Sequence, residues 1–134
     1  MLIDELKNIA RNNGIVGAGG AGFPAYAKMT EKADTVILNC VECEPLLKLH
    51  RQLLATHTEE IIQMLDEVRE SFGAKEAVIG IKSEYVTTIK AIEEVIGDFP
   101  NVRICALKAA YPMGDEVAVS YTHLRAHETA ANLV

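Results

Sequence analysis

Aromatic residues are scarce in this sequence. Phenylalanine, tyrosine and tryptophan make up 5% of the 134 residues, and tryptophan is absent. Basic residues are also in the minority, because 13 lysines and arginines stand against 19 aspartates and glutamates, a formal net charge of −6. Nucleic-acid surfaces need clustered cations, and single strands also need aromatic platforms. We therefore expect no nucleic-acid partner.

Cysteines and long apolar runs are also few. Three cysteines, an odd number, do not suggest a disulfide framework, so a reducing cytoplasm is the default compartment. No apolar run approaches the roughly 20 residues of a membrane-spanning helix, and residues 1–6 lack a signal-peptide pattern. The composition, 49% hydrophobic and 24% charged, is typical of one globular domain with its own core, and we expect no direct membrane insertion.

Short β-branched runs alternate with helical patterns along the chain. Strands are predicted at residues 35–38, 77–81 and 102–107, and loops at 39–45 and 111–116. Helices are predicted at residues 2–12, briefly at 24–29, and at 46–54, 58–72 and 83–96, with Thr58 and Ser83 as N-caps. This alternation favours an α/β fold with parallel crossovers. We expect a three-layer Rossmann-like half domain with a short, mainly parallel sheet flanked by helices.

Five glycines lie within nine residues, from Gly14 to Gly22. Glycine permits φ > 0 and a close backbone approach to a ligand, and several N–H groups in such a run can point at one anion, usually phosphate. Gly17, Gly19 and Gly22 also spell G-x-G-x-x-G, but a dinucleotide fold needs a strand just before this motif, and a helix is predicted there. The alternative is a flexible connector. Lys28 could meet a phosphate or carboxylate, or simply be solvated.

Two polar loops follow predicted strands at their carboxyl ends, where ligands bind in parallel sheets. The segment Asn39–Pro45 combines an amide, two carboxylates and a proline, and Tyr111–Glu116 follows the strand at 102–107. Each loop alone could be an ordinary surface turn. Together with the glycine loop, they favour one ligand edge suited to a sugar, a flavin or an amide.

Cysteine and histidine positions give little support for a metal site. Cys40 and Cys43 have the spacing of half a metal site or of a redox pair, but no second pair exists and Cys105 stands alone in a strand. An iron–sulfur cluster generally takes four cysteines, so we expect no metal within this chain. His50 and His57 lie in helical segments, which favours surface or packing roles.

Three motifs in this order and spacing resemble a known family. They are Gly17–Pro24, Asn39–Pro45 and Tyr111–Glu116, and together they are similar to the flavin-binding domain of the complex I flavoprotein family. The resemblance is stronger to the C subunit of Rnf-type electron-transport complexes, and it extends to cobalamin reductases and to the electron-transfer protein of proline reductase. It covers roughly residues 1–119.

The resemblance implies a site for FMN and NADH. The glycine loop would wrap the FMN phosphate and the nearby NADH, Lys28 would lie on the nucleotide side, and Asn39 would hydrogen-bond the flavin. Glu44, with Glu42 beside it, would line the nicotinamide pocket. Since the flavin would carry the chemistry, no side chain is expected to be catalytic. The implied cofactor-binding residues are Gly17, Gly19, Gly20, Gly22, Phe23, Lys28, Asn39, Glu42, Glu44, Gly114, Asp115 and Glu116.

The sequence also departs from the family pattern. The complex I motif has an acidic residue where Val41 stands, and the later half of the flavin domain and the cysteine-rich clusters are missing. Residues 120–134 do not continue the pattern, and Ser120–Thr129 resembles translated sequencing-adapter read-through, which would make the spacing of His123 and His127 accidental. A genuine short C-terminal helix is the alternative.

We therefore expect an N-terminal fragment of an FMN-dependent, NADH-oxidising electron-transfer subunit, with residues 1–119 in the FMN/NADH-binding domain. By the resemblance, the iron–sulfur clusters would lie in the missing C-terminal part, and the partners would be NADH and an electron-acceptor protein or complex. Alternatives are a flavin- or nucleotide-binding module without turnover, a cobalamin reductase-type protein and a docking subunit of a larger complex.

Overall fold

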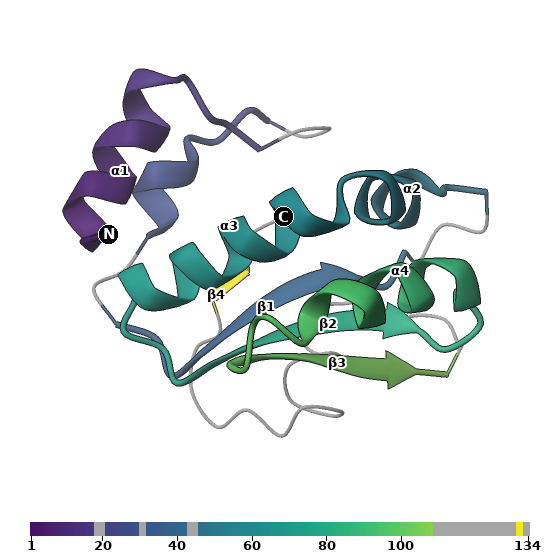
Figure 1. The fold of residues 1–134 in the computed structure, drawn as a ribbon. Helices are drawn as coiled ribbons and strands as arrows, with labels where there is room; N and C mark the ends of the chain where they lie inside the picture. Colours follow the sequence, from purple (N-terminus) through teal and green to yellow (C-terminus); the bar gives the residue numbers. More distant parts are fainter. Residues whose placement is uncertain (18–20, 30–31, 43–45, 109–130, 133–134) are drawn as a thin grey trace.

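The fold is a parallel sheet with helices between its strands, as seen in a computed structural model (Figure 1). The structure describes residues 1–17, 21–29, 32–42, 46–108 and 131–132. Its helices are α1 (Ile3–Asn12), the 3-10 helix η1 (Ala25–Lys28), α2 (Leu49–Thr56), α3 (Thr58–Ser71) and α4 (Val86–Ile96). Its strands are β1 (Thr35–Cys40), β2 (Glu76–Lys82), β3 (Val102–Leu107) and the short β4 (Ala131–Asn132).

The strands lie in the order β3-β2-β1-β4, and each neighbouring pair is parallel. Their carboxyl ends therefore meet at one edge of the sheet. In the register, Asn39 of β1 lies opposite Gly80 of β2, which lies opposite Cys105 of β3. The predicted α/β class and the parallel sheet are confirmed.

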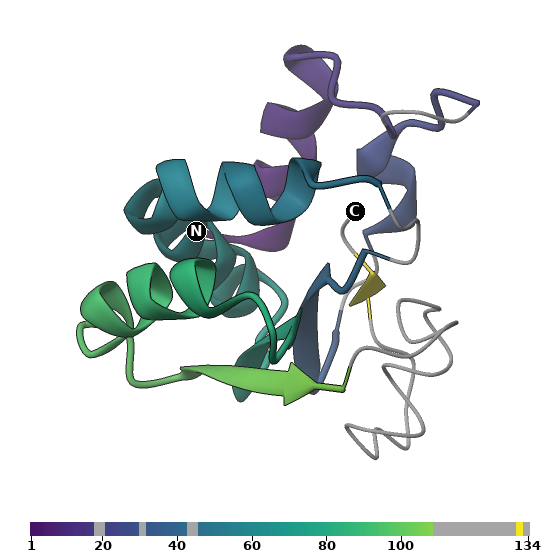
Figure 2. The same ribbon diagram turned by 90° about the vertical axis from the view of Figure 1, so that its right-hand side faces the viewer.

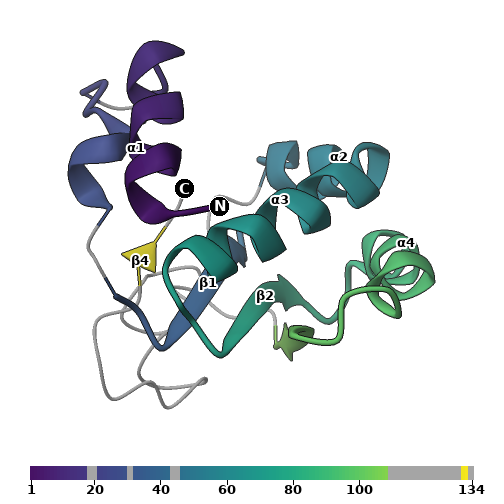
Figure 3. The same cartoon turned by 60° about the vertical axis from the view of Figure 1, so that its left-hand side comes forward.

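Helices α2, α3 and α4 cover one face of this sheet, as the side views show (Figures 2 and 3). The main core lies between them. Alternate strand residues such as Val36, Ile79 and Ile104 point into it, and Leu54, Ile62 and Ile92 meet them from the helices. Ile37, Val41 and Leu107 form a second buried cluster. Because side chains alternate along a strand, this cluster belongs to the opposite face. The described residues place no helix there, so they supply two of the three expected layers.

Helix α1 and η1 form a unit beside α3 (Figure 3). Leu6 and Ala10 are the buried residues of α1. The helix ends where predicted, because Gly14 adopts a φ of +63°, a left-handed conformation that suits glycine. Pro24 precedes η1, which fits its predicted role of opening a short helix.

Several boundaries differ from the sequence prediction. β1 continues through Asn39 and Cys40, which were predicted to be loop, because both pair in register with β2. α4 begins at Val86 with Tyr85 as its N-cap residue, so Ser83 does not cap it. The Oγ1 of Thr58 donates to the carbonyls of Leu54 and Ala55 at 2.7 and 3.2 Å instead of capping its own helix.

Two further sequence expectations concern the chain's surroundings and its end. In the described part of the chain, no helix combines the length and apolarity that a bilayer crossing requires. The predicted boundary at residues 119 and 120 lies outside the described residues. Beyond it, Ala131 and Asn132 pair with Val36 and Ile37 of β1.

Candidate functional site

Asn39 and Glu42 stand at the carboxyl edge of the sheet, on and just after the central strand β1. The Oδ1 atom of Asn39 accepts a hydrogen bond from the Val41 N–H at 3.1 Å. This local bond is an Asx turn, which redirects the backbone as the strand ends.

Glu42 is a buried carboxylate, with 6% of its surface exposed. Its Oε1 atom accepts the His50 backbone N–H at 2.7 Å, and the His50 Nδ1 lies 3.9 Å from the same oxygen. Its Oε2 atom is buried and has no hydrogen-bond partner among the residues that the structure describes. An unsatisfied buried polar atom costs about 1–3 kcal/mol, so this oxygen suits a ligand that donates a hydrogen bond.

The bond from His50 makes Glu42 a remote cap for α2. His50 is the second residue of that helix, so its N–H is one of the donors that the helix itself cannot satisfy. The first turn of α2 contains no acidic residue, and no side chain of Lys48 caps it. A carboxylate at this end is favoured by the helix dipole. Sequence reasoning assigned His50 only a surface or packing role, because its partner lies eight residues away.

Cys40 lies next to this carboxylate and is unsuited to thiolate chemistry. Burial raises the pKa of its thiol from 9.0 to about 12, and the charge of Glu42 adds to the rise. The thiolate is the form that binds metals and attacks disulfides. Cys40 is therefore a packing residue of β1, and Cys43 lies outside the described residues.

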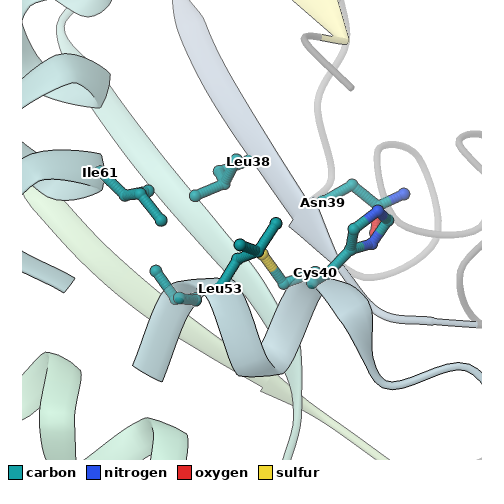
Figure 4. A pocket seen from close by; sticks show the side chains of 7 residues that line it. Leu38, Asn39, Cys40, Leu53 and Ile61 are labelled. Carbon is teal, nitrogen blue, oxygen red and sulfur yellow. The ribbon is translucent and has the colours of Figure 1, made fainter. Parts of the chain in front are cut away.

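A cavity of about 170 Å³ opens beside Asn39 (Figure 4). Its walls are mostly apolar: Leu38 comes from β1, while Leu53 and Ile61 come from α2 and α3. Asn39, Cys40 and His50 also line it. The cavity is small beside the volumes of roughly 300–1,000 Å³ that are typical of cofactor pockets.

The glycine loop is closed at its base. Val16 and Pro24 form an antiparallel bridge, the Gly17 N–H donates to the Phe23 carbonyl at 2.9 Å, and the Ala25 N–H donates to the Ile15 carbonyl at 3.0 Å. The Gly17 N–H is therefore already engaged. Gly22 has a φ of +68°, so the predicted need for a left-handed glycine is met at this position. Gly19 and Gly20 lie outside the described residues.

Gly17, Phe23 and Lys28 line a second cavity of about 270 Å³ between α1, η1 and α3. Phe23 is half exposed. The Lys28 ammonium lies 5.3 Å from the centre of the Phe23 ring, within the range of a cation–π interaction. Beside the glycine loop, the Lys28 cation is suited to a phosphate, and the Phe23 ring is suited to stacking on a ring of the same ligand.

Four of the described site residues line one of the two cavities, and Gly22 and Glu42 line neither. Gly17, Phe23 and Lys28 share the larger cavity, while Asn39 lines the smaller one beside Glu42, and the two cavities share no lining residue. Glu44, Gly114, Asp115 and Glu116 lie outside the described residues.

Comparison with known proteins identifies the family. The sequence pattern of the Nuo51 FMN-binding domain matches residues 10–130. The chain is 38% identical to cobalamin reductase PduS of Citrobacter freundii over 84% of this chain and 24% of that protein. It is 33% identical to the C subunit of the Na(+)-translocating ferredoxin:NAD(+) oxidoreductase complex of Acetobacterium woodii, over 84% of this chain and 26% of that subunit.

Solved structures agree on the fold. A chain of an NAD+-reducing NiFe hydrogenase in the air-oxidized state superposes with a TM-score of 0.73, at 24% identity, over 90% of this chain and 23% of that chain. The chain spans about a quarter of the length of these two curated relatives. With a family match over most of its residues, the chain belongs to the Nuo51 FMN-binding domain family.

Proposed function

We propose that this chain supplies the FMN-binding part of an electron-transfer protein that oxidises NADH. FMN, when bound, accepts a hydride and passes electrons on singly. The chain's own share is to bind the flavin, to orient it and to set the charge around it. The iron–sulfur clusters that would take the electrons are proposed to lie outside this chain.

The buried carboxylate of Glu42 is the observation that carries this proposal. Its Oε2 atom needs a hydrogen-bond donor, and the oxidised isoalloxazine ring and the ribityl chain of FMN offer N–H and O–H donors. Asn39, at the same edge of the sheet, carries an amide that can donate to a flavin carbonyl. The donors and acceptors of this edge therefore fit a flavin.

Lys28, Phe23 and the glycine loop would hold the phosphate side. The Lys28 ammonium can pair with a phosphate, and the positive φ of Gly22 lets the backbone turn toward it. The half-exposed ring of Phe23 can stack on a ligand ring. We propose the same roles as the sequence suggested for the residues outside the described ranges: Glu44 toward nicotinamide, and Gly114, Asp115 and Glu116 against the flavin and nicotinamide.

The partners follow from the same proposal. The Acetobacterium woodii relative is a subunit of an ion-translocating complex, so we propose that this chain acts with an acceptor protein or complex, at the cytoplasmic side of the membrane and through other subunits. A flavin-binding module without turnover is the second candidate. It is supported because the matching family is described as an FMN-binding domain, a description that names a cofactor and no reaction.

Flavin titration followed by reduction separates these candidates. The chain is expected to quench FMN fluorescence on binding, and Lys28→Gln should weaken that binding by about tenfold, the worth of one charge-assisted hydrogen bond. Lys90→Gln, at an exposed position of α4, is the matched control. In the full-length protein that the resemblance implies, anaerobic NADH should then bleach the visible absorbance of the bound flavin, whereas this chain alone is expected to be inactive in NADH oxidation. Binding without bleaching would identify the non-turnover module, and no binding would refute both candidates.

A further inference from the structure

Helix α4 contacts the first turn of α2 through two interactions. The Arg51 guanidinium lies 4.3 Å from the centre of the Tyr85 ring. The buried Oγ1 of Thr88 donates to the Arg51 carbonyl at 3.2 Å. Arg51 directly follows His50, the residue whose N–H binds Glu42. Two contacts from the start of α4 therefore reach the helical turn whose N–H binds the Glu42 carboxylate.

These contacts are unlike the exposed ion pairs elsewhere on the surface. Tyr85 is 8% exposed and Thr88 is 4% exposed, so both are fixed where the start of α4 packs against α2. Among the described residues, Arg51 has no ion pair. Its guanidinium is thus held by the ring, which a planar cation stacks on well. The result is a defined orientation for the start of α2.

We propose that Arg51, Tyr85 and Thr88 are positioning residues for the Glu42 carboxylate. They fix the first turn of α2, which places the His50 N–H, and that N–H sets the direction in which the free Oε2 of Glu42 points. None of the three needs to touch the cofactor. The inference rests on the proposed function only for the statement that Glu42 faces FMN.

Hydrogen exchange tests the positioning without any ligand. Thr88→Val keeps the shape of the side chain and removes its donor, so the His50 amide should exchange roughly five times faster, as expected for losing a bond worth about 1 kcal/mol. Arg51→Met should act in the same direction, and Thr88→Ser should restore the slow rate. Arg103→Gln is the control, because Arg103 pairs with Glu76 at the opposite edge of the sheet.

The flavin readout separates positioning from mere stability. In Thr88→Val the affinity for FMN should fall by about tenfold, and the reduction potential of the bound flavin should become more positive, because a negative carboxylate moves away from the ring. A residue with only a structural role would lower the unfolding temperature and leave that potential unchanged. Unchanged His50 exchange or an unchanged potential would overturn the proposal. If the unaltered chain bound no FMN, the proposed function would fail, and His50 exchange would decide the positioning alone.

Discussion

Gly17, at the base of the glycine loop, and Gly22, near its end, are expected to respond differently to replacement by alanine. Gly22 has a φ of +68°, with nothing within 4 Å of an added Cβ. Its only penalty is the left-handed backbone, which costs an L-residue roughly 1–2 kcal/mol. At Gly17 the φ lies outside that region, and a Cβ would meet the Phe23 carbonyl oxygen at 3.8 Å, an ordinary contact.

The difference between the two variants isolates this backbone term. Replacing glycine by alanine also reduces the entropy of the unfolded chain, which stabilises the fold by about 0.4–1 kcal/mol, but that gain is common to both sites. Gly22→Ala should therefore be less stable than Gly17→Ala by roughly 1–2 kcal/mol. For a domain of this size, that corresponds to unfolding temperatures about 4–8 °C apart.

Thermal unfolding followed by circular dichroism measures this difference directly. Gly22→Asn should recover part of the loss, because asparagine tolerates the left-handed region better than alanine. The reasoning would be wrong if Gly22→Ala and Gly17→Ala unfolded within about 2 °C of each other, less than the smallest separation expected.

Three further predictions concern single side chains. Asn39→Ala should weaken FMN binding by about 1–3 kcal/mol in a fluorescence titration, with the exposed Asn101→Ala as control; equal losses would remove Asn39 from the site. Because folding raises the pKa of Cys40 from 9.0 to about 12, its contribution to the free energy of unfolding is fully present below pH 9 and is lost as pH rises toward 12. Iodoacetamide at pH 8 should accordingly alkylate Cys40 at least about 100-fold more slowly in the native chain than in urea. The reason is that a pKa higher by about three units leaves roughly a thousandfold less thiolate to react. Comparable alkylation rates would contradict the burial of Cys40. Thr58→Val should lower the free energy of unfolding by about 1 kcal/mol, since it deletes a buried hydrogen bond of 2.7 Å. Thr56→Val, at an exposed position, should change it by less than about 0.5 kcal/mol. A reversed order in urea unfolding would show that the Thr58 hydrogen bond does not stabilise the fold.

Local patterns allowed most of the fold to be predicted. The strand at Val102–Leu107 agrees with the structure at both ends, because Val102 and Ile104 are β-branched and favour a strand. The strand before Asn39 was predicted too short, since an asparagine lowers strand propensity. The pairing of Asn39 with Gly80 depends on a residue far along the chain, which local patterns do not reveal. The N-cap predicted at Thr58 was wrong for a similar reason, because α2 runs almost directly into α3 and offers its own carbonyls.

The chemistry of the candidate site was harder to predict than its place. The position after a parallel strand is enough to direct attention to Asn39 and Glu42. That Glu42 caps α2 through His50 depends on how two helices pack, as does the stacking of Arg51 on Tyr85. Neither interaction leaves a periodic signal, because the partners are separated by a turn or by a whole strand and helix.

The closed base of the glycine loop affects the free energy of ligand binding. The bridge between Val16 and Pro24 joins the two ends of the loop, so the entropy of bringing those ends together is lost when the protein folds, before any ligand arrives. Ligand binding then does not have to supply this closure entropy, and pre-organisation of this kind raises affinity without adding a contact. Substitutions that open the bridge would transfer the closure entropy to the binding step, and they would weaken the ligand from a position that never touches it.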